Sequence, residues 1–258
     1  MKNCKKVLVV SGHGKGSSGY QDNGASATDG TTERGIVVEV GKYLEKFLEE
    51  WREGSVETFG VHFRKTLNDK ITKINEYCRE KNLYYKNSIL VSIHADWSGA
   101  IEGVGGYFYR GSTDSRELLV SISEEVAKVG GRKSLYQKPD TSSRFGSLGI
   151  VKNTSPLAVL IEIGSLKSDN NKKDGLELLT NTQSQKDIAF GIFKGILSYI
   201  GEELPEKTCE EKNYDEILRK NSICWEFCEN IKNKNIEINK ELADIQEMIS
   251  ENSKELRG

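Results

Sequence analysis

Short runs dominated by Val, Ile and Leu alternate along most of this 258-residue chain with longer segments of helical periodicity. The runs 5–11, 88–94 and 157–163 are typical of strands buried on both faces of a sheet. Between them, apolar side chains recur every three or four residues, as over 36–51, and predict helices that pack by one face. This alternation indicates an α/β domain with helices on both faces of a sheet.

The other elements follow from the same patterns. Residues 12–32 are rich in Gly, Ser, Asp and Thr and predict a loop, after which Thr31 or Thr32 can cap a helix. We expect a further strand over 104–109, a loop from 129 to 149, and helices over 66–81, 115–129 and 184–201.

Composition and charge exclude several classes of protein. With 37 Lys and Arg against 39 Asp and Glu, the net charge of -2 leaves no electrostatic footprint for nucleic acid. No apolar run approaches the ~18–20 residues of a membrane span, so no membrane insertion is expected. The apolar stretch 7–10 is too short for a signal peptide, which predicts accumulation in the cytoplasm. Five scattered cysteines predict reduced thiols.

Two of the three histidines come at the ends of predicted strands. His13 directly follows the first strand and His94 ends the strand 88–94. Ligands of open α/β sheets bind beyond the carboxyl ends of the strands, so both imidazoles are expected at one edge, near Glu33. Glu162 interrupts an apolar strand, where a carboxylate is costly unless it is paired, protonated or near a metal. Two imidazoles and a carboxylate are a catalytic zinc set, and a second carboxylate can act as the base.

Each of these residues also has a purely structural interpretation. A histidine at a strand end is commonly a hydrogen-bonded rim residue, Glu33 suits the positive end of a helix, and Glu162 could form a buried ion pair. Convergence of all four on one edge favours the catalytic interpretation. His62 belongs to no such pattern and is interpreted as structural. Residues 14–19 formally fit a dinucleotide-binding loop, but no helix follows them directly.

The order of the motifs is specific. A strand ending in Gly-His-Gly is followed by Asp22-x-Gly24-Ala25 and by Glu33 at a helix start, and then by Ser-Ile-His-Ala at 92–95. A glycine and aromatic strand covers 105–109, and Leu-Ile-Glu-Ile-Gly at 160–164 precedes Ser-Asp at 168–169. Over about residues 5–200 the chain resembles the zinc-dependent N-acetylmuramoyl-L-alanine amidases of the amidase-3 type. That resemblance implies a mixed, mostly parallel sheet of about six strands flanked by helices.

The resemblance also implies residue roles and a reaction. His13, Glu33 and His94 would hold zinc, and Glu162 would be the catalytic glutamate. The implied substrate is peptidoglycan, which is cut at the amide bond between N-acetylmuramic acid and L-alanine.

Some positions depart from the family pattern. Asp96 stands where the family usually has Asn, and residues 65–79 replace its usual arginine-rich stretch. Lys152 occupies roughly the position of a basic residue that precedes the last motif. Asp96 and Lys152 are therefore weak candidates for contacts with the substrate.

Other functions share these features. Another zinc peptidase or deacylase could use the same ligand set, and a non-catalytic wall-binding relative could keep it. A wall hydrolase without an export signal must be released by lysis or through a pore, which is typical of phage or prophage endolysins and of mother-cell lysins of sporulation. Of these two settings, the endolysin is the one that we expect.

Pro205 marks the expected boundary between a catalytic domain, 1–204, and a linker with a helical segment, 205–258. Apolar and small polar residues recur there in two heptad rows: Ile217, Cys224, Ile231, Ile238 and Ile245, and Asn221, Cys228, Asn235, Leu242 and Ile249. This pattern predicts a helix that forms a coiled coil or packs back on the main domain. The segment could form a homo-oligomer, target the wall, or make the chain an interaction protein with a vestigial domain. The heptad accounts for Cys224 and Cys228 better than a metal site does.

Overall fold

The computed structural model describes residues 4–15, 21–59, 66–96, 103–132, 134–167 and 175–204. The chain divides into two units, Met1–Leu204 and Pro205–Gly258, and the second lies outside the described residues. The predicted heptad helix belongs to this second unit and stays a prediction. His62 and residues 16–19 of the glycine-rich string also lie outside the described residues. No helix in the described ranges is long and apolar enough to cross a membrane. Cys4 and Cys78, the two described cysteines, are free.

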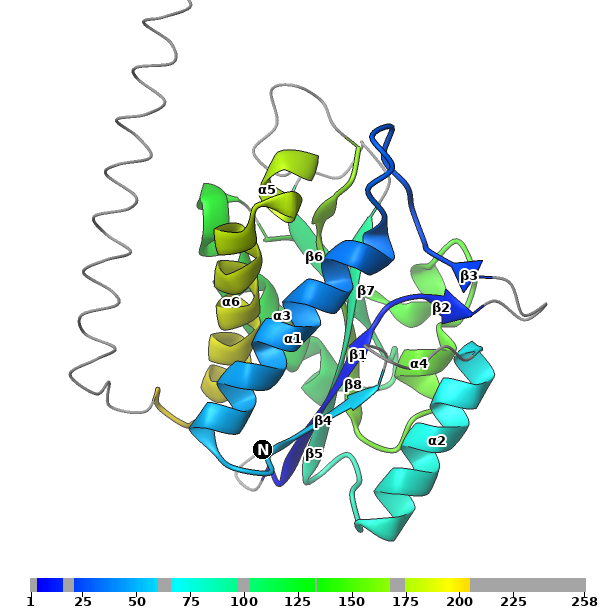
Figure 1. The fold of residues 1–258 in the computed structure, drawn as a ribbon. Coiled ribbons are helices and arrows are strands. Elements are labelled where there is room, and N and C mark those ends of the chain that lie inside the picture. Colours follow the sequence, from blue (N-terminus) through cyan, green and yellow to red (C-terminus); the bar gives the residue numbers. More distant parts are fainter. Residues whose placement is uncertain are drawn as a thin grey trace, which may run out of the picture. The chain divides into compact units, whose positions relative to one another are not determined.

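A six-stranded sheet forms the centre of the first unit (Figure 1). In spatial order its strands are β4 (Val56–Phe59), β1 (Lys6–Ser11), β5 (Ser88–Asp96), β8 (Leu157–Ser165), β6 (Val104–Phe108) and β7 (Ser134–Pro139). The first four are parallel, β6 is antiparallel to β8, and β7 is parallel to β6. The expected mixed, mostly parallel sheet is confirmed.

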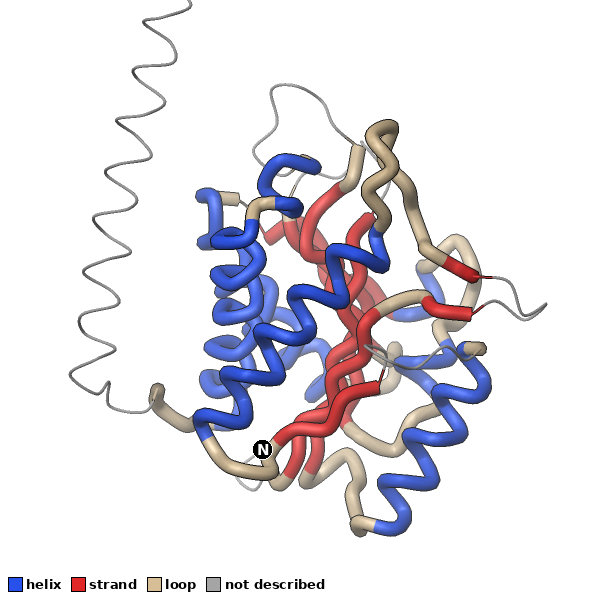
Figure 2. The backbone as a smooth tube through the Cα atoms, in the orientation of Figure 1, coloured by secondary structure: helices blue, strands red, loops and turns tan. Residues whose placement is uncertain are grey.

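Helices cover both faces of this sheet (Figure 2). One layer consists of α1 (Glu33–Trp51), α3 (Thr113–Lys128) and α6 (Thr182–Ile200), and the other of α2 (Leu67–Glu80) and the short α4 (Gly149–Lys152). The remaining described elements are β2 (Gly14–Lys15), β3 (Gln21–Asp22), α5 (Leu176–Thr180) and the 3-10 turns Val129–Gly131 and Asp140–Ser142.

The packing of strand β8 on both of its faces explains why its sequence is almost continuously apolar. Val159 and Ile161 belong to the core beneath α1, α3 and α6, whereas Ala158 and Leu160 belong to the core beneath α2 and α4. Side chains alternate along a strand, so Glu162 continues the row of Ala158 and Leu160. The register of β8 with β5 is regular up to His94–Glu162 and then shifts, so that Asp96 pairs with Ser165. This irregularity is a β-bulge.

The helix termini follow local chemistry. Thr32 is the N-cap of α1, where its hydroxyl accepts a hydrogen bond from the backbone N–H of Gly35. At the start of α2, Thr66 and Asp69 form a reciprocal capping box. The expected cap near Thr31 or Thr32 and the expected helix over 66–81 are therefore confirmed.

Two strands escaped the sequence analysis. The segment 129–149, expected to be a loop, contains β7, and β4 follows the first helix. Both lie at edges of the sheet, where a strand has one neighbour and can be short and polar, as Val-Glu-Thr-Phe in β4 is. The expectation of a featureless loop over 12–32 is also corrected, because β2 and β3 form a two-residue antiparallel ribbon there.

Candidate metal centre

The predicted site residues meet at the carboxyl ends of the three central parallel strands. His13 follows β1, His94 lies near the end of β5, and Glu162 pairs with His94 in the register between β5 and β8. Glu33 is the first residue of α1. The backbone N–H of Gly12 donates to the carbonyl of Ile93 at 2.9 Å and so ties the end of β1 to β5. The strand order thus brings together residues that are far apart in the sequence.

Glu33 contacts both histidines through its two carboxylate oxygens. His13 Nε2 lies 2.8 Å from Glu33 Oε2, and His94 Nδ1 lies 3.0 Å from Glu33 Oε1. The imidazole rings meet edge to face, with centroids 5.1 Å apart. Each residue offers one ligand atom, and these three atoms all lie within 4.8 Å of one another. The donor set fits a divalent metal ion such as zinc, with coordination positions left open.

Backbone amides fix the carboxylate of Glu33. The N–H of Ala25 donates to Oε2 at 3.0 Å, and the N–H of Ala95 donates to Oε1 at 3.1 Å. Burial alone would raise the pKa of Glu33, but the hydrogen bonds and charges of His13 and His94 outweigh it and hold the pKa well below its usual range. Glu33 is therefore held as an ionised carboxylate, the form that can bind a metal ion.

Asp22 orients His13. Its Oδ2 lies 3.1 Å from His13 Nδ1, and its Oδ1 accepts a hydrogen bond from the N–H of Gly24 at 3.0 Å. A carboxylate on Nδ1 favours the tautomer that leaves Nε2 free as a ligand, the usual arrangement behind a metal-binding histidine. The sequence indicated Asp22 only as part of a motif, because its contact with His13 depends on the ribbon of β2 and β3.

Opposite effects act on the two histidines. For His13, burial lowers the pKa, but contacts with Glu33 and Asp22 exceed it and the net pKa is raised. For His94, burial is the largest effect and the net pKa is lowered, since only Glu33 opposes it. A neutral imidazole is the form that binds a metal, so the environment of His94 suits a ligand.

Two glycines leave room for these side chains. A Cβ on Gly12 would lie 2.6 Å from Cε1 of His94, and a Cβ on Gly24 would lie 2.4 Å from Oε2 of Glu33. Gly24 also has φ +68°, in the left-handed region. His13 itself has φ +64°, a conformation that costs a residue other than glycine roughly 1–3 kcal/mol. The chain therefore accepts backbone strain at His13 to form this cluster.

Glu162 has one carboxylate oxygen with no hydrogen-bond partner in the described part of the chain. This oxygen, Oε2, is enclosed. Burial first, and then the negative charges of Glu33 and Asp96, raise the pKa of Glu162 well above its usual value, against an opposing effect of Arg144. A partly buried carboxyl group with a raised pKa is a candidate for proton transfer.

The structure brings one of the two weak substrate-contact candidates to the site. Asp96 ends β5 close enough to Glu162 to raise its pKa, and its backbone carbonyl accepts a hydrogen bond from the N–H of Leu166 at 2.8 Å. Lys152 is exposed at the end of α4, and within the described ranges no hydrogen bond or ion pair joins it to His13 or Glu162.

Other residues around Glu162 were not predicted. Tyr107 on β6 and Tyr136 on β7 meet edge to face with ring centroids 6.0 Å apart. Burial first, and then the charge of Glu162, raise the pKa of each phenol. Arg144, on the loop after β7, carries a positive charge that reaches Glu162. The aromatic run 105–109 signalled Tyr107, whereas Tyr136 and Arg144 had no signal because β7 was not expected.

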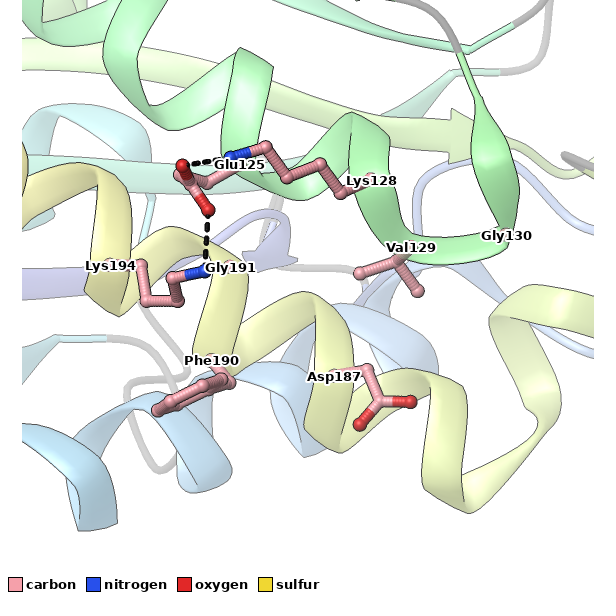
Figure 3. Close-up of a pocket in the computed structure, with 8 residues that line it drawn as sticks. All are labelled: Glu125, Lys128, Val129, Gly130, Asp187, Phe190, Gly191 and Lys194. Carbon is pink, nitrogen blue, oxygen red and sulfur yellow. Dashed lines mark hydrogen bonds and ion pairs between the residues drawn. The ribbon is translucent and has the colours of Figure 1, made fainter. Parts of the chain in front are cut away.

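A pocket elsewhere on this unit has a different character (Figure 3). It lies between α3 and α6, where Glu125 forms ion pairs with Lys128 and Lys194. The other residues that line it are Val129, Gly130, Asp187, Phe190 and Gly191. It contains none of the predicted site residues and no histidine or cysteine, so the chemistry belongs to the strand ends.

Comparison with known proteins agrees with this geometry. A family model described as N-acetylmuramoyl-L-alanine amidase matches residues 7–198. Comparison with curated proteins gave no match.

Solved structures share the fold. An N-acetylmuramoyl-L-alanine amidase from Clostridium difficile 630 is 19% identical with a TM-score of 0.60, over 78% of this chain and 100% of that one. The CwlD amidase from Clostridioides difficile, solved in complex with the GerS lipoprotein, is 24% identical with a TM-score of 0.60, over 76% and 98%. The catalytic domain of the CD27L endolysin, described as targeting Clostridia difficile, is 20% identical with a TM-score of 0.56, over 78% and 99%.

The packing at Gly24 predicts a specific loss of metal binding. Gly24→Ala places a methyl group against Glu33, so the affinity for Zn²⁺ should fall at least about ten-fold. Gly30→Ala is the matched control, since Gly30 lies in the same loop with φ +88° and has open space around its Cβ position. Both variants should lose roughly 1–2 kcal/mol of unfolding free energy to the backbone. Equal Zn²⁺ affinity of the two variants in a competition titration would contradict the assignment.

Proposed function

Because the chain belongs to the N-acetylmuramoyl-L-alanine amidase family, whose model matches residues 7–198, we propose that His13, Glu33 and His94 bind a catalytic zinc ion and that Glu162 is the catalytic acid and base. The chain is an amide hydrolase that cuts peptidoglycan between N-acetylmuramic acid and L-alanine. The observation that carries the site assignment is the convergence of three ligand atoms within 4.8 Å, with Glu162 on the neighbouring strand.

The zinc ion, when bound, would lower the pKa of a water nucleophile and offset the charge that develops on the carbonyl oxygen. Glu162 would accept a proton from that water as its oxygen forms a bond to the carbonyl carbon. The same carboxyl group would then return the proton to the nitrogen of L-alanine as the carbon–nitrogen bond breaks. The raised pKa of Glu162 supports the second role, because such a group holds a proton that it can then donate.

Asp96 is the first of the two residues that we propose to contact the substrate. Its position at the end of β5, beside Glu162, is one from which a carboxylate can accept a hydrogen bond from a sugar hydroxyl or a peptide N–H. Lys152 is the second, and its exposed ammonium group could pair with a carboxylate of the peptide stem. Neither would take part in the proton transfer.

We propose that residues 1–204 are the catalytic domain and that residues 205–258 form a helical segment for self-association or wall targeting. The heptad pattern supports self-association, which would raise avidity on a polymeric substrate. We also propose that the chain acts on the wall as an endolysin, after release from the cytoplasm of the cell that makes it. The shared fold with an endolysin catalytic domain supports this setting.

Purified peptidoglycan tests the reaction and the metal together. Digestion should expose new amino termini of L-alanine, which mass spectrometry identifies. These termini should disappear when a chelator is present and return when Zn²⁺ is added in excess of it. New amino termini inside the stem peptide would instead indicate a zinc peptidase that uses the same ligand set.

Two substitutions separate the proposed roles. Glu162→Gln should keep stoichiometric zinc but lower kcat by about 10²–10⁴-fold, because the amide cannot accept the proton. His94→Ala should lose both zinc and activity. Glu177→Gln, an exposed change on α5, is the control and should match the wild type. Wild-type turnover by zinc-loaded Glu162→Gln would remove Glu162 from the mechanism.

Removal of residues 205–258 tests the division of the chain. The truncated protein should retain its turnover on soluble muropeptides, because every proposed site residue lies within 1–204. Sedimentation should show a smaller assembly than the full chain forms, and turnover on intact walls should fall. An unchanged sedimentation coefficient after correction for mass would exclude self-association through this segment.

A further inference from the structure

Lys70 is a lysine in a position that normally takes an apolar residue. It lies on α2 in the buried stripe that also contains Ile74 and Cys78, at successive intervals of four residues. Only 4% of its surface is exposed, and within the described ranges it is the only buried lysine. Lysine is rarely buried unless its charge meets specific partners.

The ammonium group of Lys70 reaches the turn that presents His13. Its Nζ donates to the backbone carbonyl of Ser11 at 3.3 Å and to the backbone carbonyl of His13. These two carbonyls lie on either side of Gly12, whose N–H donates to β5. The turn 11–13 is therefore tied to β5 and receives two further hydrogen bonds from Lys70 on α2.

The conformation of His13 requires such support. Its φ of +64° is unfavourable for a residue with a Cβ atom, so surrounding contacts must select it. The side chain of Asp22 contacts the imidazole ring of His13. Hydrogen bonds from a charged donor are stronger than neutral ones, and Lys70 supplies one directly to the carbonyl of His13.

We propose that Lys70 is a positioning residue of the metal centre, whose ammonium group holds the turn 11–13 so that Nε2 of His13 is presented as a ligand. This inference rests on the proposed function, because it takes His13 to be a ligand. Lys70 acts through the main chain of His13 and touches neither the metal nor the substrate.

This role depends on the hydrogen-bond donor of Lys70 and not only on the space that its side chain fills. An uncharged side chain of similar length would fill the same space but would leave both carbonyls without this donor.

Three variants test the proposal. Lys70→Met keeps the length and removes the donor, and Lys70→Arg keeps a charged donor. Lys73→Met is the control, since Lys73 lies about one turn along α2 from Lys70, is exposed and pairs with Glu76. The dissociation constant for Zn²⁺ is measured on metal-free protein by competition with a chromophoric chelator. Lys70→Met should weaken binding about 10–100-fold, Lys70→Arg should recover most of that loss, and Lys73→Met should have no effect.

Thermal unfolding of the metal-free proteins separates positioning from general stability. A residue that only supports the fold would lower the unfolding temperature and leave the zinc affinity of the folded protein unchanged, and that result would overturn the proposal. If Lys70→Met does not fold, Lys70→Gln is measured in the same way. Failure of both to fold would make Lys70 a residue of the core and would also overturn it.

The same titration distinguishes this inference from the proposed function. If the wild type binds no zinc, or if His94→Ala binds as tightly as the wild type, the metal centre itself is wrong. If His94→Ala loses zinc while Lys70→Met retains full affinity, only the positioning role fails.

Discussion

The carboxylate of Glu33 is the point at which the separate parts of this site are joined. It contacts the imidazoles of His13 and His94 and accepts backbone N–H groups from Ala25 and Ala95. These contacts connect the ends of β1 and β5 to the loop before α1. Because Glu33 is the first residue of α1, the start of that helix must lie at the edge of the sheet, and the loop before it must return there.

Strand order explains why three sequence-distant segments supply the chemistry. β1, β5 and β8 are neighbours at the centre of the sheet and run in the same direction, so their carboxyl ends share one edge. The other strands, β4, β6 and β7, complete the sheet and supply neither a proposed metal ligand nor the proposed acid and base. Central strands are buried on both faces and hold their ends firmly, which suits ligands that must keep a fixed geometry.

The sequence predicted the strands and helices whose apolar residues directly reflect how they are buried in the core. Strands covered on both faces are recognisable as apolar runs. The ends of two of them identified His13 and His94, and Glu162 was identified as a carboxylate that interrupts a third. The edge strands were missed because they need fewer apolar residues. Asp22 and Lys70 gave no independent signal, since their roles depend on where a short ribbon and a helix pack.

The bulge in β8 has a consequence for the sides of the sheet. Ile163 and Leu166 lie three residues apart, an odd interval that would place them on opposite faces of a regular strand, yet both belong to the core beneath α1, α3 and α6. The extra residue reverses the phase of the alternation. Deletion of Gly164 would therefore leave Ile163 and Leu166 two residues apart and still on one face of a now regular strand, while Glu162 and all residues before it kept their places.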